Sequence, residues 1–255
     1  MPEGFLYTVY ERRLRREIDE SHLPQHIGVI LDGHRRYARA EGLPDYAASY
    51  RRGMARFEEF LGWAQDPRIP AITAWVLSPQ NLARPDEELE PYYDVLIELF
   101  DRLPAIAEAY DLHVRPIGRL DLLPEHLVEA ARRLEQARPT GEATLNIALG
   151  YGGREEIVDA ARRLVVELVE SGIPPEELAE HITDTTLGAH MYSADVPDAD
   201  LIIRTSGESR LSGFLLWQSA YSEFAFINVF WPQFRRVDYL RTLRDFSQRS
   251  RRFGR

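Results

Sequence analysis

The sequence contains neither cysteine nor lysine. Without cysteine, the chain cannot form disulfides, use a thiolate nucleophile or bind zinc through thiolates. All 31 basic residues are arginine, so Schiff-base chemistry and a P-loop lysine are excluded as well. These two absences remove whole classes of covalent catalysis and nucleotide binding from consideration.

Excess positive charge and long hydrophobic runs are also missing. The formal net charge is −10, which argues against a general nucleic-acid binder, although local clusters of arginine can still bind phosphate. No apolar run approaches the length of a transmembrane helix, and the N-terminal stretch lacks the basic-then-apolar order of a secretory signal. We therefore expect a cytoplasmic protein whose partners do not include nucleic acid.

The pattern of the chain predicts a single α/β domain over residues 1–255. Short apolar runs alternate with helical patterns, which is typical of a parallel sheet with right-handed crossovers, and no internal repeat or linker interrupts them. Residues 1–22 predict an amphipathic helix that packs on the domain or on a partner subunit, with membrane contact as an alternative, and residues 250–255 form a basic tail. The predicted strands are Ile27–Leu31, Pro70–Leu77, Leu112–Ile117, Ala143–Leu149, Asp200–Arg204 and Ala225–Val229.

The most informative stretch runs from residue 26 to residue 37, where an apolar run ends in a carboxylate, a glycine and two arginines. Asp32 stands at the carboxyl end of a predicted buried strand, where open α/β sheets bind ligands, and Gly33 allows the backbone to approach a ligand closely. A helix start beside Arg35 and Arg36 is an anion site that suits a diphosphate. Asp32 fits such a site when Mg²⁺ bridges it to phosphate oxygens. A solvated Asp-Gly turn with surface arginines explains this stretch equally well when it is taken alone.

Two further predicted strands end in polar loops. Loop 78–85 places Asn81 and Arg84 three residues apart, which suggests another phosphate-facing group, although a plain polar turn explains this loop better by itself. Loop 205–213 carries an arginine and several hydroxyls directly after Arg204 and is a second phosphate-binding signature. The stretch 86–110 predicts a helix that is apolar nearly all round, which belongs either in the core or in the wall of an apolar cavity.

Four motifs now carry a family resemblance. They are Asp32-Gly33-x-x-Arg36, Ser78-x-x-Asn81-x-x-Arg84-Pro85, Tyr151-Gly152-Gly153-Arg154-x-Glu156-Ile157 and the run IRTSGESRLSGFLLWQ over residues 203–218. Together they resemble cis-prenyltransferases, the undecaprenyl diphosphate synthase family, from about residue 26 to the C-terminus. The chain most resembles the short-chain actinobacterial members that make Z,E-farnesyl diphosphate.

The resemblance implies a fold, a reaction and a product. The fold is one α/β domain with a six-stranded parallel sheet flanked by helices and a hydrophobic substrate tunnel, usually in a homodimer. The reaction is a Mg²⁺-dependent condensation of isopentenyl diphosphate with an allylic diphosphate, geranyl or farnesyl, that creates a cis double bond. The pair Val76-Leu77 stands beside the start of this tunnel, where a bulky side chain at Val76 is expected to stop the chain near fifteen carbons. Tyr92-Tyr93 is an alternative stop, and another interpretation is that Val76 and Leu77 are simply buried strand core. A lipid product would also allow peripheral membrane contact.

The resemblance also assigns roles by position. Asp32 matches the carboxylate that holds Mg²⁺ and assists departure of the allylic diphosphate, and Glu223 matches a second metal-linked carboxylate. Asn81 matches an asparagine assigned to proton removal or substrate orientation, with Arg84 as its partner. The tail sequence 252–254 resembles an Arg-x-Gly that can reach the active site across the dimer. The other implied substrate-binding residues are Gly33, His34, Arg35, Arg36, Tyr37 and Ser78, with Arg204, Arg210 and Ser212 for isopentenyl diphosphate.

Some positions depart from the common pattern of the family. His34 and Arg35 replace the usual asparagine and glycine, while Asp45 and Ser49 stand where an arginine and a histidine usually help to bind the allylic phosphate. Arg35 can restore the charge that is lost at Asp45. Two alternatives stay open: a non-catalytic partner subunit of a heteromeric synthase, although Asp32 is present, and an enzyme of the same fold with branched or cyclising terpene coupling.

Overall fold

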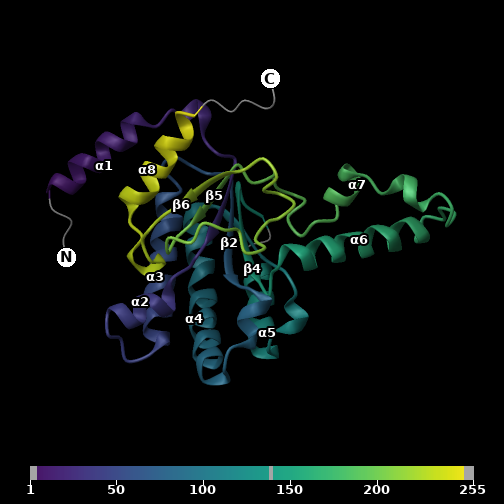
Figure 1. Ribbon diagram of the computed structural model, residues 1–255, viewed down its shortest axis with the longest axis horizontal. Helices are drawn as coiled ribbons and strands as arrows, with labels where there is room; N and C mark the ends of the chain where they lie inside the picture. The colour runs from purple at the N-terminus through teal and green to yellow at the C-terminus, as the bar shows by residue number, and fades with distance from the viewer. Residues whose placement is uncertain (1–4, 138–139, 250–255) are drawn as a thin grey trace.

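One parallel sheet forms the centre of the molecule (Figure 1). The computed structural model describes residues 5–137 and 140–249. Within them, all strands pair in parallel in one six-stranded sheet of order β3-β4-β2-β1-β5-β6, which confirms the predicted fold class. The strands are β1 (His26–Ile30), β2 (Ala71–Leu77), β3 (Leu112–Ile117), β4 (Ala143–Leu149), β5 (Leu201–Arg204) and β6 (Glu223–Phe226).

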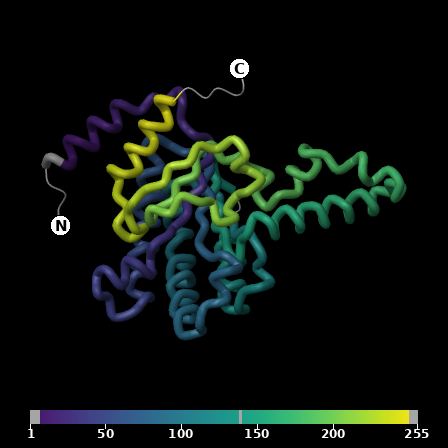
Figure 2. Tube along the Cα trace, viewed as in Figure 1, coloured from purple at the N-terminus to yellow at the C-terminus, as the bar shows by residue number. Residues whose placement is uncertain are grey.

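Helices cover the sheet and extend beyond it. The α-helices of the described residues are α1 (Phe5–Glu17), α2 (His34–Ala40), α3 (Tyr46–Trp63), α4 (Asp86–Tyr110), α5 (Glu125–Ala137), α6 (Gly153–Glu170), α7 (Asp184–Gly188) and α8 (Arg236–Ser247). The course of the chain in Figure 2 shows α6 and α7 projecting from the body as an arm, while α1 lies along α8. Residues 1–4 and the basic tail 250–255 lie outside the described residues.

The core divides at the sheet because alternate strand residues face opposite sides. In β1, Ile27 and Val29 belong to the larger cluster, which joins the sheet to side chains of α3, α4, α5 and α8, such as Phe57 and Leu96. On the other face, Gly28 leaves room for the loop after β5, because a Cβ atom there would lie 2.9 Å from the ring of Phe214. Both faces of the sheet are therefore buried, as a parallel sheet requires.

Helix α4 matches its predicted bounds and runs through Pro91 and Pro104 without a break. The last strand, β6, does not match its predicted bounds: the sequence pattern predicts residues 225–229, whereas the strand spans Glu223–Phe226. Strand β5 offers only four residues for pairing, and the register from Leu201–Glu223 to Arg204–Phe226 uses all of them. In the described residues, no helix has the length and apolarity needed to span a bilayer.

Candidate active site

A cavity of about 630 Å³ opens at the carboxyl end of the sheet, beside β1. The strand order changes direction there, since β2 lies on one side of β1 and β5 on the other, and open α/β sheets bind ligands at such points. Ten of the residues implied by the sequence line this cavity. They are Asp32, Gly33, His34, Arg35, Arg36, Ser78, Asn81, Arg84, Arg204 and Ser212.

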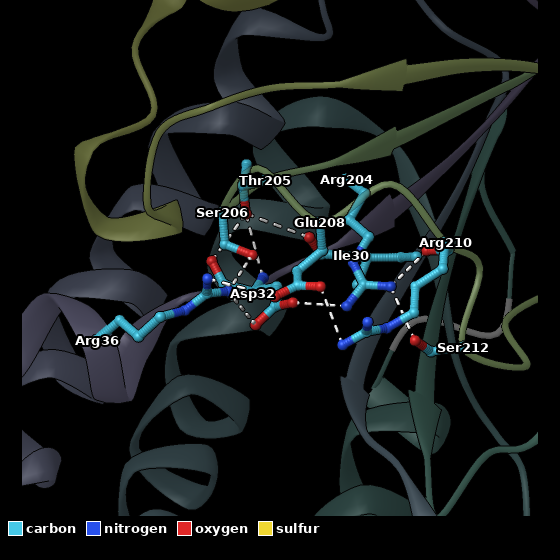
Figure 3. Close-up of polar contacts among 9 residues, drawn as sticks. All are labelled: Ile30, Asp32, Arg36, Arg204, Thr205, Ser206, Glu208, Arg210 and Ser212. Atoms are coloured by element: carbon cyan, nitrogen blue, oxygen red, sulfur yellow. Dashed lines mark hydrogen bonds and ion pairs between the residues drawn. The ribbon is translucent and has the colours of Figure 1, made fainter.

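Asp32 follows β1 directly and lies between Arg36 and Arg204 (Figure 3). Arg204 at the end of β5 donates a hydrogen bond from Nη2 to Asp32 Oδ2 at 2.7 Å, and Arg36 Nη2 approaches Asp32 Oδ1 at 4.0 Å. Burial alone would raise the pKa of the Asp32 carboxyl, but the hydrogen bond and the charge of Arg204 outweigh it, and the pKa is lowered. The side chain is 31% exposed, so an ionised carboxylate faces the cavity.

The loop after β5 is organised around Arg204, which is 5% exposed. Its Nη1 donates to Ser212 Oγ at 2.8 Å and to the main-chain carbonyl of Arg210. The guanidinium therefore holds the loop against the end of β5. It also connects Arg210 and Ser212, two predicted diphosphate-binding residues, to Asp32. Ser206 and Ser212 adopt positive φ angles of 78° and 55°, which the sharp turns of this loop require.

Glu208 lies between Arg36 of α2 and Arg210 of the loop after β5. Its carboxylate lies 3.3 Å from Arg36 Nη1 and 2.9 Å from Arg210 Nη2 (Figure 3). The side chain of Arg210 is 69% exposed and does not line the cavity; it pairs with Glu208, while the main-chain carbonyl of Arg210 accepts from Arg204. The structure therefore places the Arg210 guanidinium beside Glu208 and outside the cavity lining.

Gly33 has a φ of 107°, a conformation that side-chain-bearing residues rarely adopt. A Cβ atom at this position would lie 2.8 Å from the ring of Phe230 and 3.0 Å from Ser206 Cβ. Glycine is thus needed where the chain turns from β1 into α2 against the β5 loop. This turn places Arg35 and Arg36 in the cavity lining.

Ser78 and Asn81 hold one another across the turn that follows β2. The main-chain N–H of Asn81 donates to Ser78 Oγ, and the main-chain N–H of Ser78 donates to the side-chain oxygen Oδ1 of Asn81, each at 3.2 Å. The Asn81 carboxamide oxygen is therefore occupied by the backbone. A polar turn and a cavity-lining pair are both present here, so the two interpretations of loop 78–85 are compatible.

Two implied residues lie elsewhere. Tyr37 is buried outside the cavity lining, where its hydroxyl accepts a hydrogen bond from Arg52 at 2.8 Å. Glu223 starts β6 level with Leu201 and Ile27, at the amino edge of the sheet, and pairs with Arg249 at 2.9 Å. Since Asp32 follows the carboxyl end of β1, one chain does not bring the two carboxylates of the predicted metal site together.

The residues at the cavity suit a metal ion that is bound jointly by the protein and a diphosphate, rather than by protein ligands alone. Among the described residues, no group of three or more His, Asp or Glu side chains could hold a metal ion. Mg²⁺ commonly binds through one or two carboxylates plus phosphate oxygens. Asp32 offers one such carboxylate beside several guanidinium groups.

Sequence reasoning missed cavity residues that come from helices. Tyr50 of α3 and Arg39 of α2 line the cavity, and so does Gln80 of the turn after β2. Tyr50 occurs at a helical spacing with Met54 and Phe57 that is typical of core residues, so its pattern gave no signal of a site. Only the position of α3 over the end of β1 reveals it.

Comparisons with known proteins agree in both sequence and fold. A prenyltransferase family model described as undecaprenyl diphosphate synthase matches residues 30–254. An isoprenyl transferase of Thermus thermophilus is 48% identical over 98% of this chain and 96% of its own length, and a (2Z,6E)-farnesyl diphosphate synthase of Thermobifida fusca is 47% identical over 98% and 97%. The crystal structure of lavandulyl diphosphate synthase from Lavandula x intermedia with dimethylallyl diphosphate has a TM-score of 0.86 and 29% identity, covering 92% of this chain and 100% of that one.

Proposed function

The chain belongs to the undecaprenyl diphosphate synthase family of prenyltransferases, and we propose that it condenses isopentenyl diphosphate with an allylic diphosphate in a Mg²⁺-dependent reaction that forms a cis double bond. The observation that carries the proposal is the position of Asp32. Its carboxylate faces one cavity between Arg36, in the first turn of α2, and Arg204, at the end of β5, which belong to two separate segments of the chain. Such an arrangement can hold two diphosphates side by side.

In this proposal each of the two segments binds one substrate. Gly33 and Arg36 bind the allylic diphosphate, and Arg204, Arg210 and Ser212 bind isopentenyl diphosphate. Holding both reactants in one cavity turns carbon–carbon bond formation into an effectively unimolecular step. The allylic diphosphate leaves with the electron pair of its C–O bond, and the guanidinium groups stabilise that charge. The double bond of isopentenyl diphosphate supplies the electron pair of the new C–C bond. The proton that isopentenyl diphosphate then loses passes to the released diphosphate.

Asp32 is the proposed metal ligand, and bound Mg²⁺ supplies further neutralisation of the leaving diphosphate. Arg204 keeps the Asp32 carboxyl ionised and aimed at the cavity through the 2.7 Å hydrogen bond. Asn81 is assigned to orienting the substrate, since its carboxamide oxygen is engaged by the Ser78 amide. A non-catalytic partner subunit is not favoured, because Asp32, the carboxylate proposed to bind the metal, is present.

The product is proposed to be short, with fifteen carbons. Val76 and Tyr92 line the cavity and are 6% and 4% exposed. In this proposal these buried side chains form the part of the cavity wall that stops the growing hydrocarbon. The relative from Thermobifida fusca that is named a (2Z,6E)-farnesyl diphosphate synthase supports the same length. Branched coupling is the second candidate, favoured by the structural likeness to lavandulyl diphosphate synthase.

A homodimer completes the proposal. Strand β6 lies at the edge of the sheet and presents Phe224 and Phe226, which are 36% and 42% exposed and stacked with ring centroids 6.1 Å apart. Exposed edge strands and apolar patches favour association. Sedimentation analysis is expected to give twice the chain mass, and a monomer at micromolar concentration would contradict the homodimer.

The proposed reaction is tested by incubating the protein with Mg²⁺, isopentenyl diphosphate and dimethylallyl, geranyl or farnesyl diphosphate, followed by mass spectrometry and NMR of the dephosphorylated products. With geranyl diphosphate as the starter, a linear fifteen-carbon alcohol with one new cis double bond is expected. A branched or cyclic product would instead favour the second candidate. Absence of any product with all three starters would refute both.

A further inference from the structure

A buried carboxylate behind the cavity joins three of the groups that line it. Glu88 lies in the first turn of α4 with its side chain 8% exposed. Its Oε1 accepts a hydrogen bond from the hydroxyl of Tyr50 at 2.7 Å and lies 3.2 Å from Arg84 Nη1. Its Oε2 lies 3.6 Å from Arg35 Nε. Glu88 itself does not line the cavity, whereas all three partners do.

The three partners come from different elements of the chain. Arg35 belongs to α2 and Tyr50 to α3. Arg84 ends the turn after β2 and precedes Pro85, which leads into α4. Arg84 Nη1 also donates to the Tyr50 hydroxyl at 3.0 Å, so Tyr50 accepts from one neighbour and donates to the other. The carboxylate, the phenol and the guanidinium thus form a closed set of contacts that fixes the positions of three elements relative to one another.

Charge explains why a carboxylate is needed at this place. Arg35 and Arg84 bring two permanent positive charges to the same side of the cavity, and both approach the one buried carboxylate of Glu88. Without that negative charge, the two guanidinium groups would repel one another and turn toward solvent. The Tyr50 hydroxyl would also lose its acceptor in a buried position, which is costly.

We propose that Glu88 is a positioning residue that holds Arg35, Arg84 and Tyr50 in the arrangement that binds the diphosphate of the allylic substrate. This inference rests on the proposed function and adds a residue that touches neither substrate nor metal. It assigns Glu88 to one substrate only, since the isopentenyl diphosphate residues Arg204 and Ser212 contact Asp32 and one another instead. The consequence is a selective effect of Glu88 on the allylic substrate.

The test compares Glu88→Gln with Glu87→Gln. Glu87 is the matched control because it lies in the same turn of α4, carries the same charge and is exposed. Calorimetry of geranyl diphosphate binding with Mg²⁺ and without isopentenyl diphosphate measures the allylic site independently of turnover. We expect Glu88→Gln to raise the Kd for geranyl diphosphate about ten- to hundred-fold, as the loss of charge-assisted hydrogen bonds implies, and Glu87→Gln to leave it within about two-fold.

Steady-state kinetics supply the second readout. Glu88→Gln is expected to raise the KM for the allylic substrate by a similar factor and to change the KM for isopentenyl diphosphate less than about three-fold. Equal effects on both substrates, or an allylic Kd like that of Glu87→Gln, would overturn the positioning role. If Glu88→Gln does not fold, Glu88→Asp takes its place, because it keeps the charge but is too short to reach all three partners; a selective allylic loss is again required.

A double-mutant cycle with Tyr50→Phe tests whether Glu88 acts through its partners. If it does, the Kd of the double variant is close to that of Glu88→Gln alone, while fully additive losses contradict the mechanism. The result for the wild type separates a failure of the proposed function from a failure of the role of Glu88. A wild type that neither binds nor consumes any allylic diphosphate refutes the proposed function, whereas an active wild type with an unselective Glu88→Gln variant refutes only the role of Glu88.

Discussion

The hydroxyl of Tyr92 donates a hydrogen bond of 2.6 Å to the main-chain carbonyl of Val76, and this contact fixes α4 against the end of β2. Both residues line the cavity and are almost inaccessible to solvent. The Tyr92 ring packs on Tyr50 with centroids 4.2 Å apart. These contacts hold the apolar part of the cavity wall in one position.

Product length is therefore expected to respond to Val76. The substitution Val76→Ala removes two methyl groups from the wall and should allow products longer than fifteen carbons, because a packed interior absorbs extra methylene groups only at a cost of about 1–3 kcal/mol. Mass spectrometry of the dephosphorylated products measures the change. The control is the same substitution at Val158, which is 49% exposed on α6 and should keep the short product.

Two results would contradict this assignment. Products of fifty carbons or more from the wild type would show that the wall at Val76 and Tyr92 does not limit growth. An unchanged short product from Val76→Ala would place the stop at another residue, and the same measurement on Tyr92→Ala would then test the opposite side of the cavity.

Arg204 and Arg210 are expected to differ, although the sequence implies the same role for both. The Arg204 side chain is 6% exposed and holds Asp32, while that of Arg210 is 69% exposed and pairs with Glu208. Arg210→Ala should raise the KM for isopentenyl diphosphate about tenfold with little change in kcat, as the loss of one charge-assisted hydrogen bond implies. Arg204→Ala should also lower kcat by two decades or more, because it leaves Asp32 without its partner. Steady-state kinetics with each substrate varied in turn measure both.

The surface variant Arg162→Ala provides the baseline for these measurements, because its side chain is 71% exposed on the arm helix α6. Parallel effects of Arg204→Ala and Arg210→Ala on kcat would show that the contact with Asp32 has no catalytic consequence. A rise of the allylic KM as large as that of isopentenyl diphosphate would show that the two diphosphate sites are wrongly assigned.

Sequence patterns predicted the part of the site that lies at strand ends. Asp32 and Arg204 each follow a buried apolar run, and the carboxyl ends of parallel strands meet at one edge of the sheet. The pattern could not tell that β1 and β5 are neighbours, which brings these two side chains within hydrogen-bond distance. For Glu223, the family resemblance implied a role as a second metal-linked carboxylate. The residue begins its strand, however, and so lies at the amino ends of the strands, opposite Asp32.

The helical contribution to the site could not be predicted, for two physical reasons. Tyr50 follows the spacing of the core face of α3, so it resembles an ordinary buried residue. Glu88 follows Asp86 and Glu87 in the first turn of α4, where negative side chains are common because they interact favourably with the helix dipole. Only the packing of α2, α3 and α4 around one cavity distinguishes Glu88 from its exposed neighbours.

Asp32→Ala is expected to abolish turnover and leave the fold intact. The carboxylate is the proposed metal ligand at the leaving diphosphate, so its removal should cost several kcal/mol in the transition state. Single-turnover assays across a Mg²⁺ titration measure the loss, and thermal unfolding monitors the fold. Turnover near the wild-type level at saturating Mg²⁺ would exclude Asp32 from the reaction, and Asp32→Asn, which keeps the shape, should be nearly as inactive.

The stability of the protein is expected to depend on pH through His34. The ring is buried, and its Nδ1 lies 3.3 Å from the carbonyl oxygen of Ser49. It packs so closely on α3 that a Cβ atom at Gly53 would lie 2.0 Å from His34 Cε1. Burial lowers the pKa of His34 from 6.5 to about 4, against the raising effects of the Ser49 carbonyl and the charge of Asp32. The folded protein therefore contains the neutral imidazole.

The sign of the effect follows from proton binding. Between pH 6.5 and pH 4 the unfolded chain binds a proton at His34 that the folded chain does not, so the free energy of unfolding falls as the pH is lowered through this range. The contribution amounts to about 2 kcal/mol between pH 7.5 and pH 5. Urea unfolding of the wild type and of His34→Asn at both pH values isolates it, because all other titrating groups are common to the two proteins. His34→Asn should lose about 2 kcal/mol less stability on acidification, whatever its stability at pH 7.5, and an equal loss in both proteins would show that the buried imidazole is not responsible.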